Sequence, residues 1–328
     1  MNGQLVTILL GVAGAALLCF GADGLVRGGA ALARIARVPS LVIGLTVVAF
    51  GTSAPELVVS IDAALRGAGD IAIGNVVGSN ICNIALILGV SALVRHLPVN
   101  RTLFKLDLPA MTVSTVLLTL WCLFNGGIGR FGGALFCLLL AGYLARRFHT
   151  ARHDPEEAAA LTAEANEAPP MRWYSAAGLT ALGIVMLVLG AKLFVDGAVA
   201  AARLLHVSEA VIGLTVVALG TSLPELATSV AAALRNECDI AIGNVVGSNL
   251  FNVLCILGVA PLVSPIPARQ VNLCDFGVMC LTAALLWVMM LTGKSISRRE
   301  GGVLLTIYVL YVAKLAAFPG WGAWRGGI

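Results

Sequence analysis

The sequence predicts an all-α polytopic membrane protein with ten transmembrane helices, arranged as two inverted-topology repeats of five. Only 12% of the 328 residues are charged and 59% are hydrophobic, whereas a soluble domain has about 25% charged residues. The apolar residues form continuous runs, each long enough for the roughly 20-residue helix that a bilayer core requires. A segment of 47 residues also occurs twice in the chain.

Ten apolar runs predict the individual spans. The first has no basic residue ahead of it and no small-residue cleavage pattern, so we expect a membrane helix rather than a signal peptide. No cysteine belongs to a CxxC or Cys/His cluster, which argues against disulfide and zinc sites. The predicted spans lie near residues 5–26, 40–65, 71–94, 107–125, 129–147, 174–203, 209–234, 239–262, 272–292 and 302–320.

Basic residues gather in alternate loops between these spans. The positive-inside rule places the richer set of loops in the cytoplasm. Because the number of spans is even, both termini are then expected outside, in a plasma (bacterial inner) membrane. The poorer set holds only Arg66, Arg130, Arg203, Arg269 and Arg325, and the richer set holds Arg34, Arg37, Arg95, Arg101, Lys105, Arg146, Arg147, Arg152, Arg172, Arg235, Lys294, Arg298 and Arg299.

The chain divides into two halves joined by a polar segment. We expect residues 1–147 and 174–328 to form the five-helix repeats, and residues 148–173 to form a cytoplasmic linker too short for a core of its own. His149 and His153 are interpreted as part of a solvated loop rather than a metal site. Since each half has an odd number of spans, the second half must enter the membrane from the opposite side. Inverted repeats of this kind are typical of secondary transporters, whose substrate site lies near the midplane.

The duplicated segment covers residues 44–90 and 213–259, which are identical at 33 of 47 positions. Each copy contains the string Gly-Thr-Ser-x-Pro-Glu, ending in Glu56 or Glu225. A carboxylate at the centre of a membrane helix costs about 2.5–3.5 kcal/mol on insertion scales. Two carboxylates in matching positions therefore predict one shared cation site.

A proline precedes each of these glutamates. Pro55 and Pro224 lack a backbone donor and clash with the preceding turn, so the helix is expected to break there. The break should release nearby carbonyls as ligands, and we expect those of Ala49, Phe50 or Thr52 and their repeat partners. Irregular backbone at membrane depth is tolerated where it is buried in protein or lines a cavity.

A second string, Gly-Ser-Asn-x-x-Asn, follows in each copy. Ser79 and Asn83 are four residues apart and share a helix face, as do Ser248 and Asn252. Carboxylate, amide, hydroxyl and carbonyl oxygens together suit Ca²⁺, which takes about 6–8 oxygen ligands. Na⁺ shares this preference, and soft metals are disfavoured. Asp70 and Asp239 are expected to be N-caps, and Asp62 either lines a vestibule or is an interfacial acid near Arg66. The remaining charged residues of the spans are interpreted as snorkelling or gate-edge groups: Asp23, Lys192, Asp196 and Lys314.

These paired motifs resemble the α-repeats of the cation/Ca²⁺ exchanger superfamily, and the chain as a whole is similar to prokaryotic Na⁺/Ca²⁺ exchangers. The resemblance implies that Glu56 and Glu225 are the central ligands of Ca²⁺ and of competing Na⁺. Some members carry Asp where this chain has Asn252, which leaves stoichiometry and K⁺ dependence open. The resemblance further implies backbone carbonyls of Thr52 and Thr221 at the Ca²⁺ position, Ser53, Ser222, Ser79 and Ser248 at flanking Na⁺ positions, and Asn83 and Asn252 at the middle.

The expected function is a secondary antiporter that exchanges Na⁺ for Ca²⁺ by alternating access, with Na⁺ entry driving Ca²⁺ export. The long, Gly/Ala-rich spans 5–26 and 174–203 are the expected sliding gate. Ca²⁺/H⁺ exchange is an alternative because glutamates carry protons, and a cation channel is a further one. No Ser/His/Asp, HExxH or paired-Asp catalytic pattern is present in the sequence, so we expect no enzyme and no cofactor. Ca²⁺, Na⁺ and the lipid bilayer are the expected partners, without nucleic acid or an obligate protein.

Overall fold

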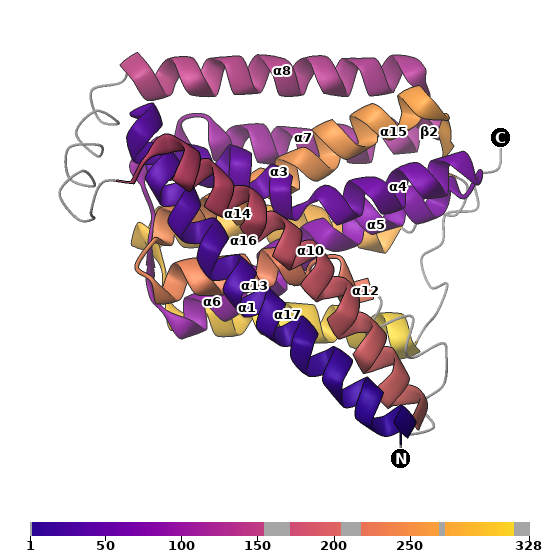
Figure 1. Cartoon of the computed structure of the whole chain (residues 1–328). Helices are drawn as coiled ribbons and strands as arrows, with labels where there is room; N and C mark the ends of the chain where they lie inside the picture. Colours follow the sequence, from indigo (N-terminus) through magenta and orange to yellow (C-terminus); the bar gives the residue numbers. More distant parts are fainter. Residues whose placement is uncertain (1, 154–170, 205–217, 269–272, 318–328) are drawn as a thin grey trace.

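The protein is described from a computed structural model that places residues 2–153, 171–204, 218–268 and 273–317 (Figure 1). Most of the predicted linker, the start of the seventh predicted span and the first five residues of the second duplicated copy lie outside these ranges. In the first half the helices are α1 (Asn2–Ala36), α2 (Ser40–Ile43), α3 (Ala49–Thr52), α4 (Ala54–Leu65), α5 (Gly69–Ile81), α6 (Gly89–Val94), α7 (Asp107–Asn125) and α8 (Arg130–His153). In the second half they are α10 (Trp173–Leu204), α12 (Ala218–Gly220), α13 (Leu223–Leu234), α14 (Cys238–Leu250), α15 (Leu257–Val263), α16 (Leu273–Gly293) and α17 (Arg298–Ala317).

Several of these helices are long and apolar enough to cross a membrane. Within the described ranges, seven continuous helical stretches meet that measure. The count is eight if Ser40–Thr52 and Ala54–Leu65, which meet at a bend of 47°, are taken as one span. Two further predicted spans correspond to α13, of which 12 residues are helical in the described chain, and to α17, which carries four charged residues. The chain is therefore a helical membrane protein, whereas the count of ten spans stays a prediction.

Three π-helical segments interrupt the membrane helices in the described part of the chain, and all three lie in the duplicated copies. They are η1 (Gly44–Val48), η2 (Cys82–Leu88) and η5 (Phe251–Ile256). A π-turn opens the regular hydrogen-bond ladder and frequently marks a functional position. The last two begin at matching places, one residue before Asn83 and one before Asn252.

The helical stretches that carry the second motif form the centre of the bundle. Gly69–Val94, comprising α5, η2 and α6, is 78% buried, and Cys238–Val263, comprising α14, η5 and α15, is 83% buried. None of the other five continuous apolar spans in the described chain exceeds 39%. The duplicated Ser and Asn residues of the second motif therefore lie in deeply buried helices.

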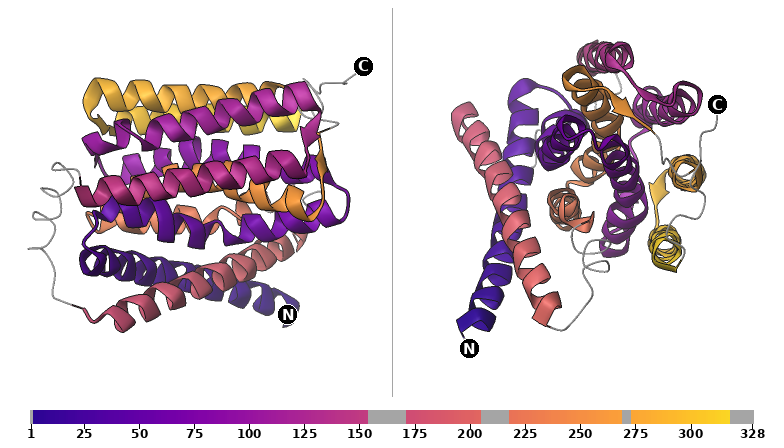
Figure 2. Two further views of the ribbon diagram at one scale, coloured as in Figure 1. Left: turned by 90° about the horizontal axis from the view of Figure 1, so that it is seen from above. Right: turned by 90° about the vertical axis from the view of Figure 1, so that its right-hand side faces the viewer.

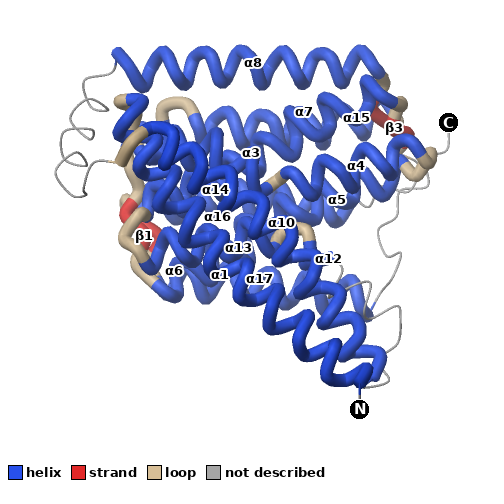
Figure 3. The backbone as a smooth tube through the Cα atoms, viewed as in Figure 1, coloured by secondary structure: helices blue, strands red, loops and turns tan. Residues whose placement is uncertain are grey.

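Two short antiparallel strand pairs connect loops at opposite ends of the bundle (Figure 3). At one end β1 (Leu97–Pro98) pairs with β4 (Ser295–Ile296), and at the other β2 (Gly127–Ile128) pairs with β3 (Ile266–Pro267). Arg235 lies at the first end, where it lines a hollow with Ser40 and Pro98. The Arg66 loop lies at the other end, because Gly69 packs against Pro267. The loops predicted to be rich in basic residues therefore share one end of the molecule.

The long helices α1 and α10 lie against each other along most of their length and form a layer at the side of the bundle (Figures 1 and 2). They run antiparallel, since Gly14 contacts Phe194 while Gly28 contacts Thr180. Glycines repeat every seven residues along both helices and permit this close approach. The glycine seam, as we name this contact, consists of Gly14, Gly21, Gly28, Gly183, Gly190 and Gly197.

Candidate cation site

The duplicated glutamates lie where a membrane helix breaks and begins again. Helix α3 ends at Thr52, Ser53 leaves the helical conformation with ψ of 7°, and α4 begins at Ala54 with Pro55 in its first turn. A proline there costs no hydrogen bond because the first N–H groups of a helix have no intrahelical acceptor. The predicted break is confirmed, and the same geometry recurs at Ser222, before α13.

The break changes two details of the expected site. Glu56 and Glu225 lie in the first turns of α4 and α13 rather than in a helix interior. The free N–H groups and the dipole of a helix N-terminus stabilise a carboxylate, which lowers the cost of burying it. In addition, the carbonyl of Ala49 accepts bonds from Ser53 N at 3.0 Å and from the Thr52 hydroxyl at 3.3 Å. It is therefore not one of the carbonyls that the break releases.

Hydrogen bonds cross between the two repeats at the glutamates. The Ser53 hydroxyl donates to Glu225 Oε1 at 2.9 Å, and the Ser222 hydroxyl donates to Glu56 Oε1 at 3.3 Å. Glu56 and Glu225 are each only 1% exposed. Each carboxylate is therefore held by the motif of the other repeat, and the two motifs form one site.

The asparagines of the second motif also meet across the repeats. Asn83 Nδ2 donates to Asn249 Oδ1 at 3.3 Å, and Asn252 Nδ2 donates to Asn80 Oδ1 at 3.0 Å. All four side chains are 1% exposed. The bonds are equivalent, because adding 169 to the residue numbers of one repeat gives those of the other.

Five buried oxygens of the predicted site have no hydrogen-bond partner within the described part of the chain. They are Glu56 Oε2, Glu225 Oε2, Asn83 Oδ1, Asn252 Oδ1 and Ser248 Oγ. A buried oxygen without a partner loses its hydration and gains nothing in return, which costs about 1–3 kcal/mol or more for a charged group. Four of the five form two symmetric pairs, and a hard cation is the ligand that such oxygens prefer.

The remaining predicted ligands lie around these atoms. Ser79 is buried on α5, and Thr52 is fully buried beside the break. Thr221 is half-buried, and it interacts with the Glu56 carboxylate as Thr52 does with that of Glu225. All ten residues predicted to bind cations therefore lie within the two broken helices and the two central helices that pack on them.

A second pair of asparagines, which are not among the predicted ligands, supports the glutamates. Asn75 Nδ2 donates to the backbone carbonyl of Glu56 at 3.3 Å and to the Ser60 hydroxyl at 3.0 Å. Asn244 does the same for Glu225 at 3.3 Å and Ser229 at 2.9 Å. Asn244 Oδ1 also accepts a 3.1 Å bond from the Thr52 hydroxyl. Identical amides in both copies of an apolar helix were the available signal.

Other charged residues form ion pairs away from the glutamates. Asp62 pairs with Arg66 at 2.8 Å at an exposed helix end, which favours the interfacial interpretation. Asp23 pairs with Arg27 at 3.5 Å and with Arg235, the C-cap of α13. Lys314 likewise pairs with Asp275 on α16, at 3.4 Å.

The predicted N-caps are wrong. Ala68 and Glu237 occupy the N-cap positions of α5 and α14, and Asp70 and Asp239 lie in the first turns instead, where they still interact with the helix dipole. Among the described residues, no group of three or more His, Cys, Asp and Glu side chains could hold a metal ion. His149 and His153 were predicted to lie in a loop, but both belong to the last turns of α8, where they stack on each other. The acidic residues of the linker lie outside the described ranges.

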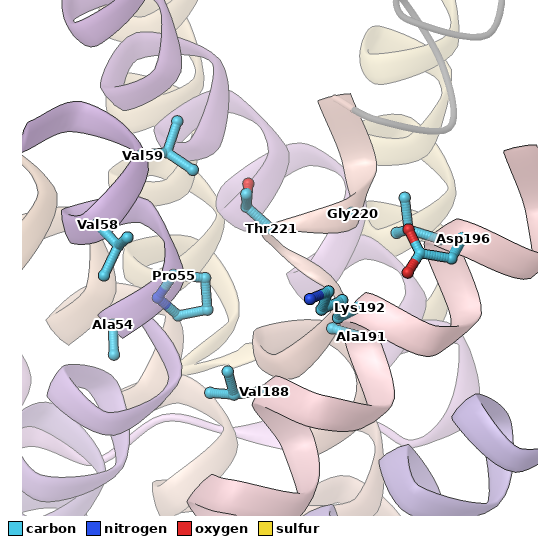
Figure 4. Close-up of a pocket in the computed structure, with 11 residues that line it drawn as sticks. Ala54, Pro55, Val58, Val59, Val188, Ala191, Lys192, Asp196, Gly220 and Thr221 are labelled. Carbon is cyan, nitrogen blue, oxygen red and sulfur yellow. The ribbon is translucent and has the colours of Figure 1, made fainter. Parts of the chain in front are cut away.

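Two cavities lie beside the broken helices of the two repeats. One, of about 410 Å³, lies between α4 and α10 and extends from Pro55 and Val59 to Thr221, with Lys192 and Asp196 on its α10 wall (Figure 4). The other, of about 600 Å³, lies between α1, α6 and α13. Their walls are repeat counterparts: Val188, Ala191, Lys192 and Val58 in the first correspond to Cys19, Ala22, Asp23 and Ala227 in the second.

Comparisons with known proteins identify similar chains. The profile of a family described as sodium/calcium exchanger protein matches residues 6–148 and 175–316. The inner membrane protein YrbG of Escherichia coli is 35% identical, with 95% of this chain and 97% of YrbG covered. The sodium/calcium exchanger MaX1 of Methanosarcina acetivorans is 34% identical, with 94% and 98% covered. A solved structure of the sodium-calcium exchanger NCX_Mj is similar at a TM-score of 0.82 and 33% identity, covering 95% of this chain and 99% of that one.

Proposed function

The chain belongs to the sodium/calcium exchanger protein family, and from that premise we propose that it exchanges Na⁺ for Ca²⁺ across a membrane by alternating access. In this cycle the inward Na⁺ gradient across the membrane drives the export of Ca²⁺. The single observation that carries the proposal is the pair of buried carboxylates with one unpartnered oxygen each, Glu56 Oε2 and Glu225 Oε2, held together by serines of the opposite repeat.

The ligand set supports transport of hard cations. The two carboxylates balance one Ca²⁺ or two Na⁺ ions. Asn83 and Asn252 add amide oxygens at the middle of the site. In the proposed assignment the carbonyls of Thr52 and Thr221 bind Ca²⁺, while the hydroxyls of Ser53, Ser222, Ser79 and Ser248 bind Na⁺ at flanking positions.

Charge couples the two ion fluxes in this proposal. An empty site carries two buried carboxylates, which are costly to enclose at membrane depth. Ca²⁺ or a pair of Na⁺ ions neutralises them and permits the site to close. The protein therefore changes its accessible side when it is loaded with either ion, and seldom when it is empty.

An architecture of ten spans in two inverted repeats fits this cycle. The antiparallel contact of α1 and α10 supports opposite insertion of the two halves, because each is the first helix of its half. The loops of Arg66 and Arg235, which are repeat counterparts, lie at opposite ends of the bundle. The positive-inside rule then orients the β1–β4 end toward the cytoplasm of a bacterial plasma membrane, with both termini outside.

The two cavities are the proposed access routes. The first leads toward Thr221 along α10 and the second toward α13 along α1. Helix α10 borders the first cavity and α1 borders the second, so a shift of this helix pair relative to α4 and α13 opens one route and closes the other. The glycine seam keeps the two helices together as one moving unit.

Loss of a central carboxylate tests the proposal. Replacing Glu56 by Gln should abolish Na⁺-dependent ⁴⁵Ca²⁺ uptake into inverted membrane vesicles. The matched control is Asp62→Asn, which removes a carboxylate from the same helix but at its exposed end, and which should retain uptake. Uptake by Glu56→Gln at the rate of the control would refute the site.

A Ca²⁺/H⁺ exchanger remains the second candidate because unpartnered carboxylate oxygens also accept protons. Vesicles given either a Na⁺ gradient or a pH gradient as the sole driving force distinguish the two. Our proposal requires uptake with the Na⁺ gradient, whereas uptake with the pH gradient alone establishes proton coupling. Flux that needs no counter-gradient would indicate a channel instead.

A further inference from the structure

The four asparagines at the centre of the molecule form a hydrogen-bonded cluster that joins the repeats. Asn83 and Asn252 each donate their amide NH₂ to the side-chain oxygen of an asparagine in the other repeat, Asn249 and Asn80 respectively. Only Asn83 and Asn252 belong to the predicted cation ligands. Asn80 and Asn249 have no unpartnered side-chain atom, so they need another explanation than cation binding.

The bonds determine which end of each ligand amide is available. An asparagine side chain carries one oxygen, which accepts, and one NH₂ group, which donates. Because the NH₂ groups of Asn83 and Asn252 point at the opposite repeat, their Oδ1 atoms are left without a partner. A flipped amide would present a donor to the cation and set its own oxygen against that of Asn80 or Asn249. Both changes are unfavourable.

Asn80 and Asn249 are themselves fixed by groups that only accept hydrogen bonds. Asn80 Nδ2 lies 3.5 Å from the carbonyl oxygen of Asn249 and 3.9 Å from the sulfur of Met279. Asn249 Nδ2 lies 3.7 Å from the sulfur of Met111. A thioether is a weak acceptor and never a donor, so the NH₂ group belongs on that side. The oxygen of each residue must then face the ligand asparagine.

We propose that Asn80 and Asn249 are positioning residues for cation exchange, which hold the amides of Asn252 and Asn83 with their oxygens toward the ion. The inference rests on the proposed function, since it takes Asn83 and Asn252 as ligands. Removal of a residue that orients a metal ligand typically lowers metal affinity by about 10–100-fold. We expect Asn80→Leu to weaken Ca²⁺ binding by at least tenfold.

A second substitution separates positioning from a purely structural role. Asn252→Asp replaces the amide by a carboxylate, which offers an oxygen in either orientation. In that background Asn80→Leu should cost less than threefold in Ca²⁺ affinity. Asn249→Leu is the matched control, because it acts on Asn83 and should still cost at least tenfold. A structural role predicts instead that Asn80→Leu costs the same in both backgrounds.

The readout is binding of Ca²⁺ alone to the full-length protein in detergent, measured by calorimetry, with thermal unfolding of the ion-free protein recorded alongside. Equal Ca²⁺ affinity of Asn80→Leu and the unaltered protein overturns the positioning role while leaving the proposed function intact. Absence of Ca²⁺ binding by the unaltered protein overturns both. If Asn80→Leu fails to fold, Met279→Leu conserves volume but removes the acceptor beside Asn80, and it should weaken Ca²⁺ binding about threefold; unchanged affinity overturns the proposal.

Discussion

Ser53 of the first repeat donates a 2.9 Å hydrogen bond to Glu225 of the second, 172 positions away in the chain. The reciprocal bond from Ser222 to Glu56 is longer, at 3.3 Å. Neither motif is complete alone, because each supplies the donor for the carboxylate of the other. A duplicated sequence thus yields one site that depends on both halves.

The Ser53 hydroxyl should contribute to Na⁺ binding. Hydrogen bonds to charged groups contribute about 1.5–3 kcal/mol, so we expect Ser53→Ala to raise the half-saturating Na⁺ concentration of exchange about tenfold. Ser222→Ala should have a smaller effect because its bond is longer. Na⁺ titration of ⁴⁵Ca²⁺ uptake measures both. Ser91→Ala, which removes a buried hydroxyl on α6, is the control, and equal curves for Ser53→Ala and Ser91→Ala would contradict the prediction.

Removing a central charge should stabilise the ion-free protein while it abolishes the response to Ca²⁺. Glu225 is buried, and an uncompensated carboxylate at membrane depth costs about 2.5–3.5 kcal/mol. Glu225→Gln removes that cost, so the ion-free protein should unfold at a higher temperature. A ligand at 100 times its Kd stabilises the native state by about 2.7 kcal/mol, and this gain should disappear in the variant.

Thermal unfolding in detergent, with and without Ca²⁺, tests both halves of that expectation. Asp62→Asn is the control, since its carboxylate is exposed and pairs with Arg66. It should unfold like the unaltered protein and keep the shift with Ca²⁺. A Ca²⁺-induced shift that survives in Glu225→Gln would show that the ion binds elsewhere.

The sequence was sufficient to predict the helix break and the pair of buried glutamates, because proline chemistry and the cost of buried charge act locally. The ligand roles of the ten residues stay a prediction. The crossing hydrogen bonds were not predictable in this way. Asn80 and Asn249 meet Asn252 and Asn83 only after two segments 169 positions apart have packed together. Asp70 was misassigned as an N-cap because the local sequence pattern fits either of two neighbouring helix positions. The turn before α5 decides between these positions, and it places Asp70 in the first turn of the helix.

A buried ion pair between α7 and α8 should matter for stability rather than transport. Arg147 Nε lies 3.2 Å from Asp107 Oδ1, with exposures of 1% and 0%, and Tyr143 donates to the same carboxylate oxygen at 2.9 Å. Removing one partner of a buried pair leaves an uncompensated charge and costs about 3–5 kcal/mol. Asp107→Ala should therefore lower the unfolding temperature strongly.

The exposed pair of Asp62 and Arg66 is the matched comparison for that experiment. Ion pairs in contact with solvent contribute about 0–1 kcal/mol, so Asp62→Ala should barely change the unfolding temperature. Correct folding of Asp107→Ala at low temperature is checked by its Ca²⁺ affinity, which should be unchanged. Equal destabilisation by the two substitutions would contradict the burial argument.

We expect the glycine seam to be needed for fast ion exchange. A Cβ atom on Gly190 would lie 2.8 Å from the backbone nitrogen of Leu18, so even alanine must push α1 and α10 apart. Overpacking of this kind costs about 1–3 kcal/mol. If the two helices move as one unit, we expect Gly190→Ala to slow Na⁺-driven ⁴⁵Ca²⁺ uptake at least fivefold. Ca²⁺ affinity in detergent should stay within twofold, because Gly190 does not contact the site oxygens.

Gly178→Ala is the control on the same helix, since a Cβ atom there meets nothing within 4 Å. Replacing an exposed helical glycine by alanine stabilises a helix by roughly 0.5–1 kcal/mol, so this variant should transport normally and unfold at an equal or higher temperature. The contrast isolates the helix contact from the loss of a glycine as such. Transport by Gly190→Ala at the rate of Gly178→Ala would mean that α1 and α10 need not stay in contact, and the gate would have to be sought in the motion of one helix alone.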